Sequence, residues 1–205
     1  MFCYTIEMKA VDTTISTPEL SSMAESMYGN LVKAVVDLQK GIVALPTAHP
    51  SAEITAKSSA LARAFRAHGL PVILVNVAGG PPGRADVTHA FNPPADWTEL
   101  ISELERQPGD HVVTKHRWGA FHETRLHHYL QAQGVTQVVL CGIATSIGVE
   151  STARNAHEHG YHVVLVEDAM TDLDAEAHAN SVKKIFPRLG EVCQAAELLA
   201  ELRAA

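Results

Sequence analysis

Short apolar segments of strand length alternate with longer amphipathic segments from residue 30 to the end of the chain. The first apolar segment covers 31–36, a helical pattern follows over 51–68, and a β-branched segment covers 71–77. Because these strands are apolar throughout rather than at every second position, they are typical of a parallel sheet that helices cover on both faces. The remaining expected elements are strands over 111–114, 137–141, 162–166 and 191–193, and helices over 122–133, 147–159, 175–186 and 195–203.

The first part of the chain lacks this regular pattern. We therefore expect an N-terminal extension over 1–29 and one α/β domain over 30–205. A length of 205 residues fits one large domain, which can bury a core without disulfides or structural metals.

Composition and charge narrow the class of protein. With 46% hydrophobic and 19% charged residues, the chain has the balance of a globular protein. Its formal net charge of −7 disfavours nonspecific binding to nucleic acid or to an anionic membrane, and no apolar run is long enough to span a bilayer. The three cysteines are widely spaced and no signal peptide is evident, so we expect a cytoplasmic protein without disulfides.

Charged and polar side chains follow the first three expected strands. Asp37 and Gln39 come after the first strand, Asn76 lies at the end of the second, and Lys115 follows the third. Active sites of parallel sheets lie at the carboxyl ends of the strands, so we expect these side chains at one edge. Taken singly, Asp37 is more typical of a cap or loop and Lys115 of a solvated surface. Together, the opposite charges could form an acid–base pair.

The segment 140–161 combines an apolar strand, a tight turn that begins at Gly142, and a helix that starts near Ser146. A helix that begins at the edge of the sheet leaves backbone N–H groups free, which suits a carboxylate or a developing oxyanion. An ordinary strand–turn–helix connection has the same pattern, so this segment alone does not establish a site. Asp168, after the next expected strand, belongs to the same edge.

Three motifs, "VVDLQKG", "TKHRWGAF" and "GIATSIGVESTARNAHEHGYHVVLVEDAM", occur in order along the chain. Together they resemble the isochorismatase-like hydrolases, also called the cysteine hydrolase superfamily. The resemblance implies a three-layer α/β/α sandwich with a six-stranded parallel sheet, assembled as a homodimer or homotetramer. It also implies a catalytic trio of Asp, Lys and Cys. Asp37 and Lys115 match the first two, whereas Gly148 occupies the position of the nucleophilic Cys.

The resemblance also implies which residues surround the substrate. A non-proline cis peptide is expected at Ile143–Ala144, with the Ala144 and Gly148 amides directed at a small-molecule substrate. Arg84 and His89, in the long loop after the second strand, are candidates to cover the pocket. The substrate-binding residues that we expect are Gln39, Asn76, Ala144, Thr145 and His178.

Neither a metal nor another cofactor is expected. The zinc-dependent branch of this superfamily carries an Asp-x-His pair after the second strand, and this sequence reads Asn76-Val77-Ala78-Gly79 there. Cys141 lies within an expected strand, seven positions before Gly148, and is best explained as a buried small hydrophobic residue.

Three functions are consistent with a site that lacks the Cys. The first is hydrolysis of a vinyl ether of the isochorismate type by general acid catalysis from Asp37, which needs no thiolate. The second is an amidase or related C–N hydrolase, for which the covalent route is closed without a nucleophile. The third is a catalytically inactive relative that binds a small metabolite. Retention of both Asp37 and Lys115 favours an enzyme.

Overall fold

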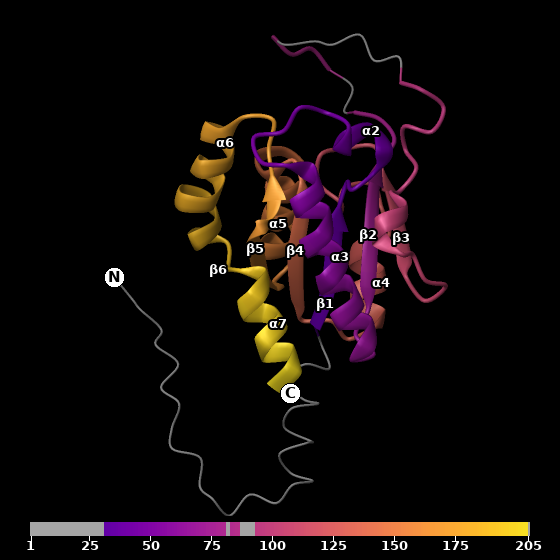
Figure 1. Cartoon of the computed structure of the whole chain (residues 1–205), viewed down its shortest axis with the longest axis vertical. Coiled ribbons are helices and arrows are strands. Elements are labelled where there is room, and N and C mark those ends of the chain that lie inside the picture. Colours follow the sequence, from indigo (N-terminus) through magenta and orange to yellow (C-terminus); the bar gives the residue numbers. More distant parts are fainter. Residues whose placement is uncertain (1–30, 81–82, 87–92, 205) are drawn as a thin grey trace, which may run out of the picture.

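Six strands form one sheet in the order β3-β2-β1-β4-β5-β6, and all neighbouring pairs are parallel (Figure 1). This computed structural model describes residues 31–80, 83–86 and 93–204. Within them, the expected six-stranded parallel α/β architecture is confirmed. The strands are β1 (Leu31–Val36), β2 (Val72–Val77), β3 (His111–Lys115), β4 (Gln137–Ile143), β5 (His162–Thr171) and β6 (Glu191–Cys193).

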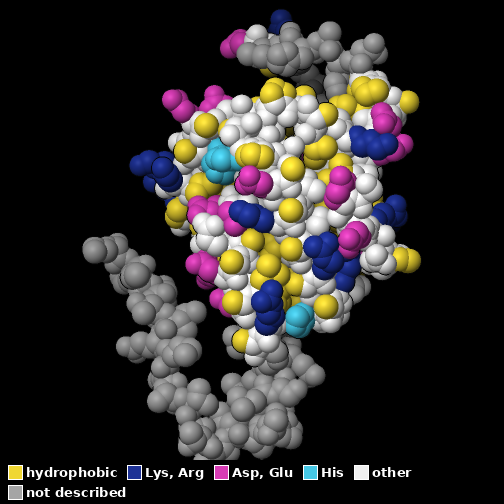
Figure 2. Space-filling model, viewed as in Figure 1, with side chains coloured by type: hydrophobic (Ala, Val, Ile, Leu, Met, Phe, Trp, Pro, Cys, Tyr) yellow, Lys and Arg dark blue, Asp and Glu magenta, His cyan; other side chains and the backbone are white. Residues whose placement is uncertain are grey.

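Helices cover both faces of the sheet, as the apolar strands require. Figure 1 shows α3 (Ser51–Ala67) and α7 (Ala195–Ala204) in front of the sheet, with α4 (Leu126–Ala132) and α5 (Glu150–Glu158) behind it. Successive side chains of β1 enter opposite cores. Val32, Ala34 and Val36 belong to the core under α4 and α5, and Leu31 and Val35 belong to the core under α3 and α7. On the α3 face, basic and acidic side chains are interspersed (Figure 2).

Several elements differ in extent from the expectation. Strand β5 continues to Thr171 instead of ending at 166, because Met170 and Thr171 pair with Gly142 and Ile143 of β4 after a shift in register. Helix α4 begins at Leu126 rather than at 122, since Glu123 has a φ of 54° that no helix interior accommodates. The expected helix over 175–186 is divided into α6 (Ala175–Asn180) and the turns η3 (Ser181–Ile185) and η4 (Phe186–Arg188).

Gly142 allows the ends of β1 and β4 to approach closely. Its φ is +125°, and a Cβ at this position would overlap the carbonyl oxygen of Val36 in β1. The register of β4 against β5 also shifts between Leu140 and Gly142. Gly142 of β4 therefore lies beside Val36, the last residue of β1 and the one before Asp37.

Two short helical elements were not expected: α2 (Lys40–Val43) and η1 (Ser102–Leu104). The expected helix over 147–159 begins as the π-helical turn η2 (Thr145–Val149) and continues as α5. The expected extension over 1–29 and the loop residue His89 lie outside the described residues. Among the helices that the structure describes, none has both the length and the apolar character needed to cross a membrane.

Candidate active site

Asp37 and Lys115 form a buried ion pair at the carboxyl edge of the sheet. Asp37 directly follows β1 and Lys115 is the last residue of β3, so the lysine side chain spans the end of β2 between them. Lys115 Nζ donates to Asp37 Oδ2 over 2.7 Å. The exposed fractions are 4% for Asp37 and 1% for Lys115. The expected contact between the two charges is therefore present, and it is shielded from water.

Asp37 has three features that are unusual for an aspartate. Burial raises the pKa of its carboxyl group from 3.8 to about 6, and this effect exceeds the opposing influence of Lys115. Its Oδ1 atom is buried and has no hydrogen-bond partner within the described part of the chain. The backbone at Asp37 has a φ of 54°, which is unusual for a residue other than glycine. One carboxyl oxygen thus accepts from Lys115, and the other has no hydrogen-bond partner among the described residues.

Gly148 lies directly against this ion pair. It belongs to η2, which follows β4. A Cβ on Gly148 would be 2.9 Å from Asp37 Oδ2 and 3.7 Å from Lys115 Nζ. The structure thus brings the three expected catalytic positions together. The Ile143–Ala144 peptide before this turn is cis, as expected.

One amide of the η2 turn, that of Ser146, already has an anionic partner, which sequence reasoning missed. Ser146 N–H donates to Asp172 Oδ2 over 2.6 Å, and Asp172 is 2% exposed. Its other oxygen, Oδ1, accepts from Leu173 N–H over 2.7 Å. Asp168, the acidic residue that the sequence pointed to, instead accepts from Ala195 N–H at the start of α7 and pairs with Lys57. The signal was present, since Asp172 follows β5, but the strand is longer than its apolar run.

The side chain of Thr145, the first residue of the same turn, contacts His178. Thr145 Oγ1 and His178 Nδ1 are 2.8 Å apart, and the His178 ring stands edge-on to His49 with centroids 4.7 Å apart. Burial, with a smaller contribution from His49, lowers the pKa of His178. His178 and His49 line a cavity of about 400 Å³ whose lining includes neither Asp37 nor Lys115.

The side chains of Gln39 and Asn76 form hydrogen bonds with neighbouring protein groups. The Gln39 amide is fully buried, donates to the carbonyl oxygens of Val77 and Trp97, and accepts from Val77 N–H. The Asn76 amide donates to the Thr98 carbonyl oxygen and accepts from the hydroxyl of a threonine in β3. Both side chains therefore fasten the segment 97–98 to the end of β2.

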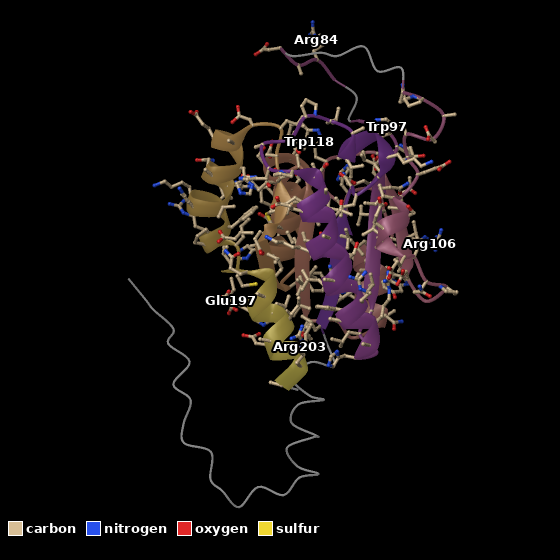
Figure 3. The ribbon with its side chains drawn as sticks, viewed as in Figure 1. Arg84, Trp97, Arg106, Trp118, Glu197 and Arg203 are labelled. Carbon is tan, nitrogen blue, oxygen red and sulfur yellow. The ribbon has the colours of Figure 1, made fainter. Side chains whose placement is uncertain are left out.

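Other candidates lie apart from the ion pair. Arg84 is exposed, on the loop above the carboxyl edge in Figure 3. Cys141 is fully buried inside β4 and accepts from Ser58 Oγ over 3.4 Å. Within the described ranges, no group of three or more His, Cys, Asp and Glu side chains is arranged to hold a metal ion.

Comparison with known proteins agrees with the geometry. The family model of the isochorismatase domain matches residues 32–197. The chain is 40% identical to YecD of Escherichia coli O157:H7, an uncharacterized isochorismatase family protein, over 82% of this chain and 94% of that protein. It is also 40% identical to the ureidoacrylate amidohydrolase RutB of Variovorax paradoxus, but only over 46% of this chain and 38% of RutB.

A solved structure has the same fold. An isochorismatase family protein from Burkholderia thailandensis superposes with a TM-score of 0.81 at 42% identity, covering 85% of this chain and 96% of that one. The matched region of the family model includes Asp37, Lys115 and the η2 turn. The chain therefore belongs to the isochorismatase family and is a hydrolase of that family.

Proposed function

We propose that this hydrolase cleaves the vinyl-ether bond of a small molecule of the isochorismate type, with Asp37 as general acid and without a sulfur nucleophile. The observation that carries the proposal is the buried Oδ1 of Asp37, which has no hydrogen-bond partner among the described residues, together with the pKa of about 6 of that carboxyl group. A carboxyl group with such a pKa is partly protonated near neutral pH and can donate its proton to a substrate.

The reaction begins with a proton transfer from Asp37 and consumes one water molecule. The protonated Asp37 carboxyl donates its proton to the terminal carbon of the vinyl ether, which leaves an oxocarbenium ion and the Asp37 carboxylate. Water adds to the cation and returns a proton to Asp37. The resulting hemiketal collapses into a keto acid and an alcohol. Lys115, 2.7 Å from Oδ2, stabilises the Asp37 anion that forms in the first step.

Gly148 is compatible with this chemistry because no step requires a nucleophilic side chain. In our proposal it occupies the position of the family's catalytic Cys, and its lack of a side chain leaves the Asp37 carboxylate in place. A Cβ on Gly148 would lie only 2.9 Å from Asp37 Oδ2. This short distance supports the proposed role, since any side chain here would displace the carboxylate.

The substrate contacts that we propose come mainly from the η2 turn. Ala144, just before the turn, and Gly148 supply backbone groups at the edge of the sheet, and the contact between Thr145 and His178 supports the turn. Gln39 and Asn76 shape the site by fixing the segment 97–98.

A C–N hydrolase is the second candidate, and the partial similarity to the amidohydrolase RutB favours it. In that reaction Asp37 would act as a base on water, because the position of the thiol holds Gly148. The third candidate is a site that binds a metabolite without catalysing a reaction.

A substrate panel separates these candidates. The purified protein is incubated with isochorismate, a simpler enolpyruvyl ether, amides and ureides, and released keto acid and ammonia are both measured. We expect keto acid from the ethers alone. Ammonia from amides or ureides would replace the proposal with the second candidate, and tight binding without any product would replace it with the third.

We also infer, from the family resemblance, a homodimer or homotetramer that works in the cytoplasm. Light scattering during size-exclusion chromatography should give a mass of two or four times 22.1 kDa. A mass of one chain would contradict the inferred assembly.

A further inference from the structure

The hydroxyl of Thr152 connects the two segments that flank the ion pair. Thr152 lies in the first turn of α5 and is fully buried. Its Oγ1 donates to the carbonyl oxygen of Gly148 over 2.7 Å and accepts from the N–H of Ala120 over 3.1 Å. Gly148 belongs to the η2 turn, and Ala120 to the loop that follows Lys115. One side chain thus holds both catalytic segments.

Only one of these two bonds is ordinary for a helix. Threonine often donates to the carbonyl four residues earlier, which explains the bond to Gly148 by itself. The bond from Ala120 joins residues 32 positions apart, and Ala120 is fully buried, so its N–H has no access to water. Leaving such a group without a partner is costly in free energy.

The loop after Lys115 also lies closely on α5. A Cβ on Gly119 would overlap the side-chain oxygen of Asn155 and lie 3.2 Å from the carbonyl oxygen of Ser151. The loop reaches back to the ion pair as well, because Lys115 Nζ donates to the Arg117 carbonyl oxygen over 3.3 Å. The packing of this loop on α5 therefore determines the position of the Arg117 carbonyl oxygen, which accepts from the Lys115 ammonium.

We propose that Thr152 is a positioning residue for the reaction: by fastening the 117–120 loop to the η2 turn, it holds the Lys115 ammonium on Asp37 beside Gly148. The role of Thr152 in catalysis rests on the proposed function. Its effect on the position of the Lys115 ammonium does not. Without the hydroxyl, the loop loses its bond to α5, the Arg117 carbonyl shifts, and the ammonium moves away from Asp37.

That consequence has a direct signature at Asp37. Lys115 lowers the pKa of Asp37 against the larger effect of burial, so a displaced ammonium lets this pKa rise above about 6. The test is a carboxyl ¹³C NMR titration, with the Asp37 signal assigned by its loss in Asp37→Asn. Thr152→Val removes the hydroxyl at nearly constant shape, and Thr152→Ser retains it. Thr55→Val, at a buried threonine of α3 on the other face, is the control.

We expect the Asp37 pKa to rise by about one unit in Thr152→Val and to stay unchanged in Thr152→Ser and Thr55→Val. An unchanged Asp37 pKa in folded Thr152→Val would overturn the inference. If that variant does not fold, Thr152→Ala is titrated instead. If neither folds, hydrogen exchange in the wild type decides: a slowly exchanging Ala120 amide supports the inference, and exchange as fast as in an exposed loop contradicts it.

The titration is independent of the substrate. If the wild type releases no keto acid, the proposed function fails, while the Asp37 titration still decides the role of Thr152. If keto acid is released, the pH profile of kcat/KM should shift with the Asp37 pKa in Thr152→Val and not in Thr152→Ser.

Discussion

Two lysines, Lys33 and Lys115, are buried in the same sheet but have different partners. Lys33 lies within β1, is 0% exposed, and donates from Nζ to the carbonyl oxygen of Ser58 in α3. Lys115 ends β3, is 1% exposed, and donates to the carboxylate of Asp37. Lys33 thus has a neutral partner in the core under α3, whereas Lys115 has an anionic partner at the carboxyl edge.

Burial has the largest effect on the pKa at both places, and the partner groups determine how far that effect is offset. Burial lowers the pKa of Lys33 from 10.5 to about 8, and the guanidinium groups of Arg66 and Arg63 add to this, while Cys141 opposes it. At the edge, burial of the pair raises the pKa of Asp37 to about 6, and Lys115 limits that rise. A buried cation without a carboxylate destabilises the fold, whereas the same cation beside one holds a carboxyl group in a range that suits proton transfer.

The largest expected effect is that of Lys115→Met, which leaves Asp37 buried without its cation. Removing one member of a buried pair costs about 3–5 kcal/mol of unfolding free energy. The loss should be large at pH 8, where Asp37 is ionised, and smaller at pH 5, where it is protonated. Urea denaturation at both pH values measures it. An equal loss at pH 5 and pH 8 would show that packing, not charge, holds this region.

Lys33→Met should act in the opposite direction. A pKa lowered from 10.5 to about 8 corresponds to a penalty of about 3 kcal/mol for the charged form at pH 7, so the variant should be more stable by up to that amount. The folded state releases the Lys33 proton more readily than the unfolded state. The wild type should therefore gain stability as pH rises from about 8 to 10.5, and Lys33→Met should lack this gain. A less stable Lys33→Met would contradict the comparison.

The titration of Asp37 should make the free energy of unfolding depend on pH. Its pKa is raised in the folded state, from 3.8 to about 6, so the folded protein binds this proton more tightly than the unfolded chain. Stability should fall by about 3 kcal/mol as pH rises from about 4 to 6, and Asp37→Asn should lack that fall. Thermal or urea unfolding across this range is the measurement. Parallel curves for the two proteins would mean an ordinary Asp37 pKa.

The smallest effect is expected for Gly148→Ala. The new Cβ would lie 2.9 Å from Asp37 Oδ2 and 3.2 Å from Val36 Cγ1, so the carboxylate must move at a cost of about 1–3 kcal/mol. Gly109→Ala is the matched control, because nothing lies within 4 Å of its Cβ position. Equal stabilities for the two alanine variants would show that the space beside the ion pair is wider than the structure has it.

The sheet and the ion pair could be predicted because both depend on short patterns. Continuously apolar strands give a parallel sheet, and residues after such strands meet at one edge, which brought Asp37 to Lys115. Thr152 could not be found this way, because its role arises from a contact between distant segments. Asp172 was missed because β5 is longer than its apolar run. Lys33 was overlooked because it lies inside an apolar run, and the sequence does not show whether a single lysine in such a run is buried or exposed.

The central claim is that Asp37 protonates the substrate, and the rate of keto acid release by Asp37→Asn tests it most directly. General acid catalysis typically contributes 10²–10⁴-fold, so Asp37→Asn should lose about 3–5 kcal/mol of transition-state stabilisation on isochorismate or a simpler enolpyruvyl ether. Asparagine keeps the shape of the side chain and can deliver no proton. A rate for Asp37→Asn reduced by at least about a hundredfold, in a folded protein, is the result that we predict. A rate near that of the wild type would show that Asp37 is not the acid.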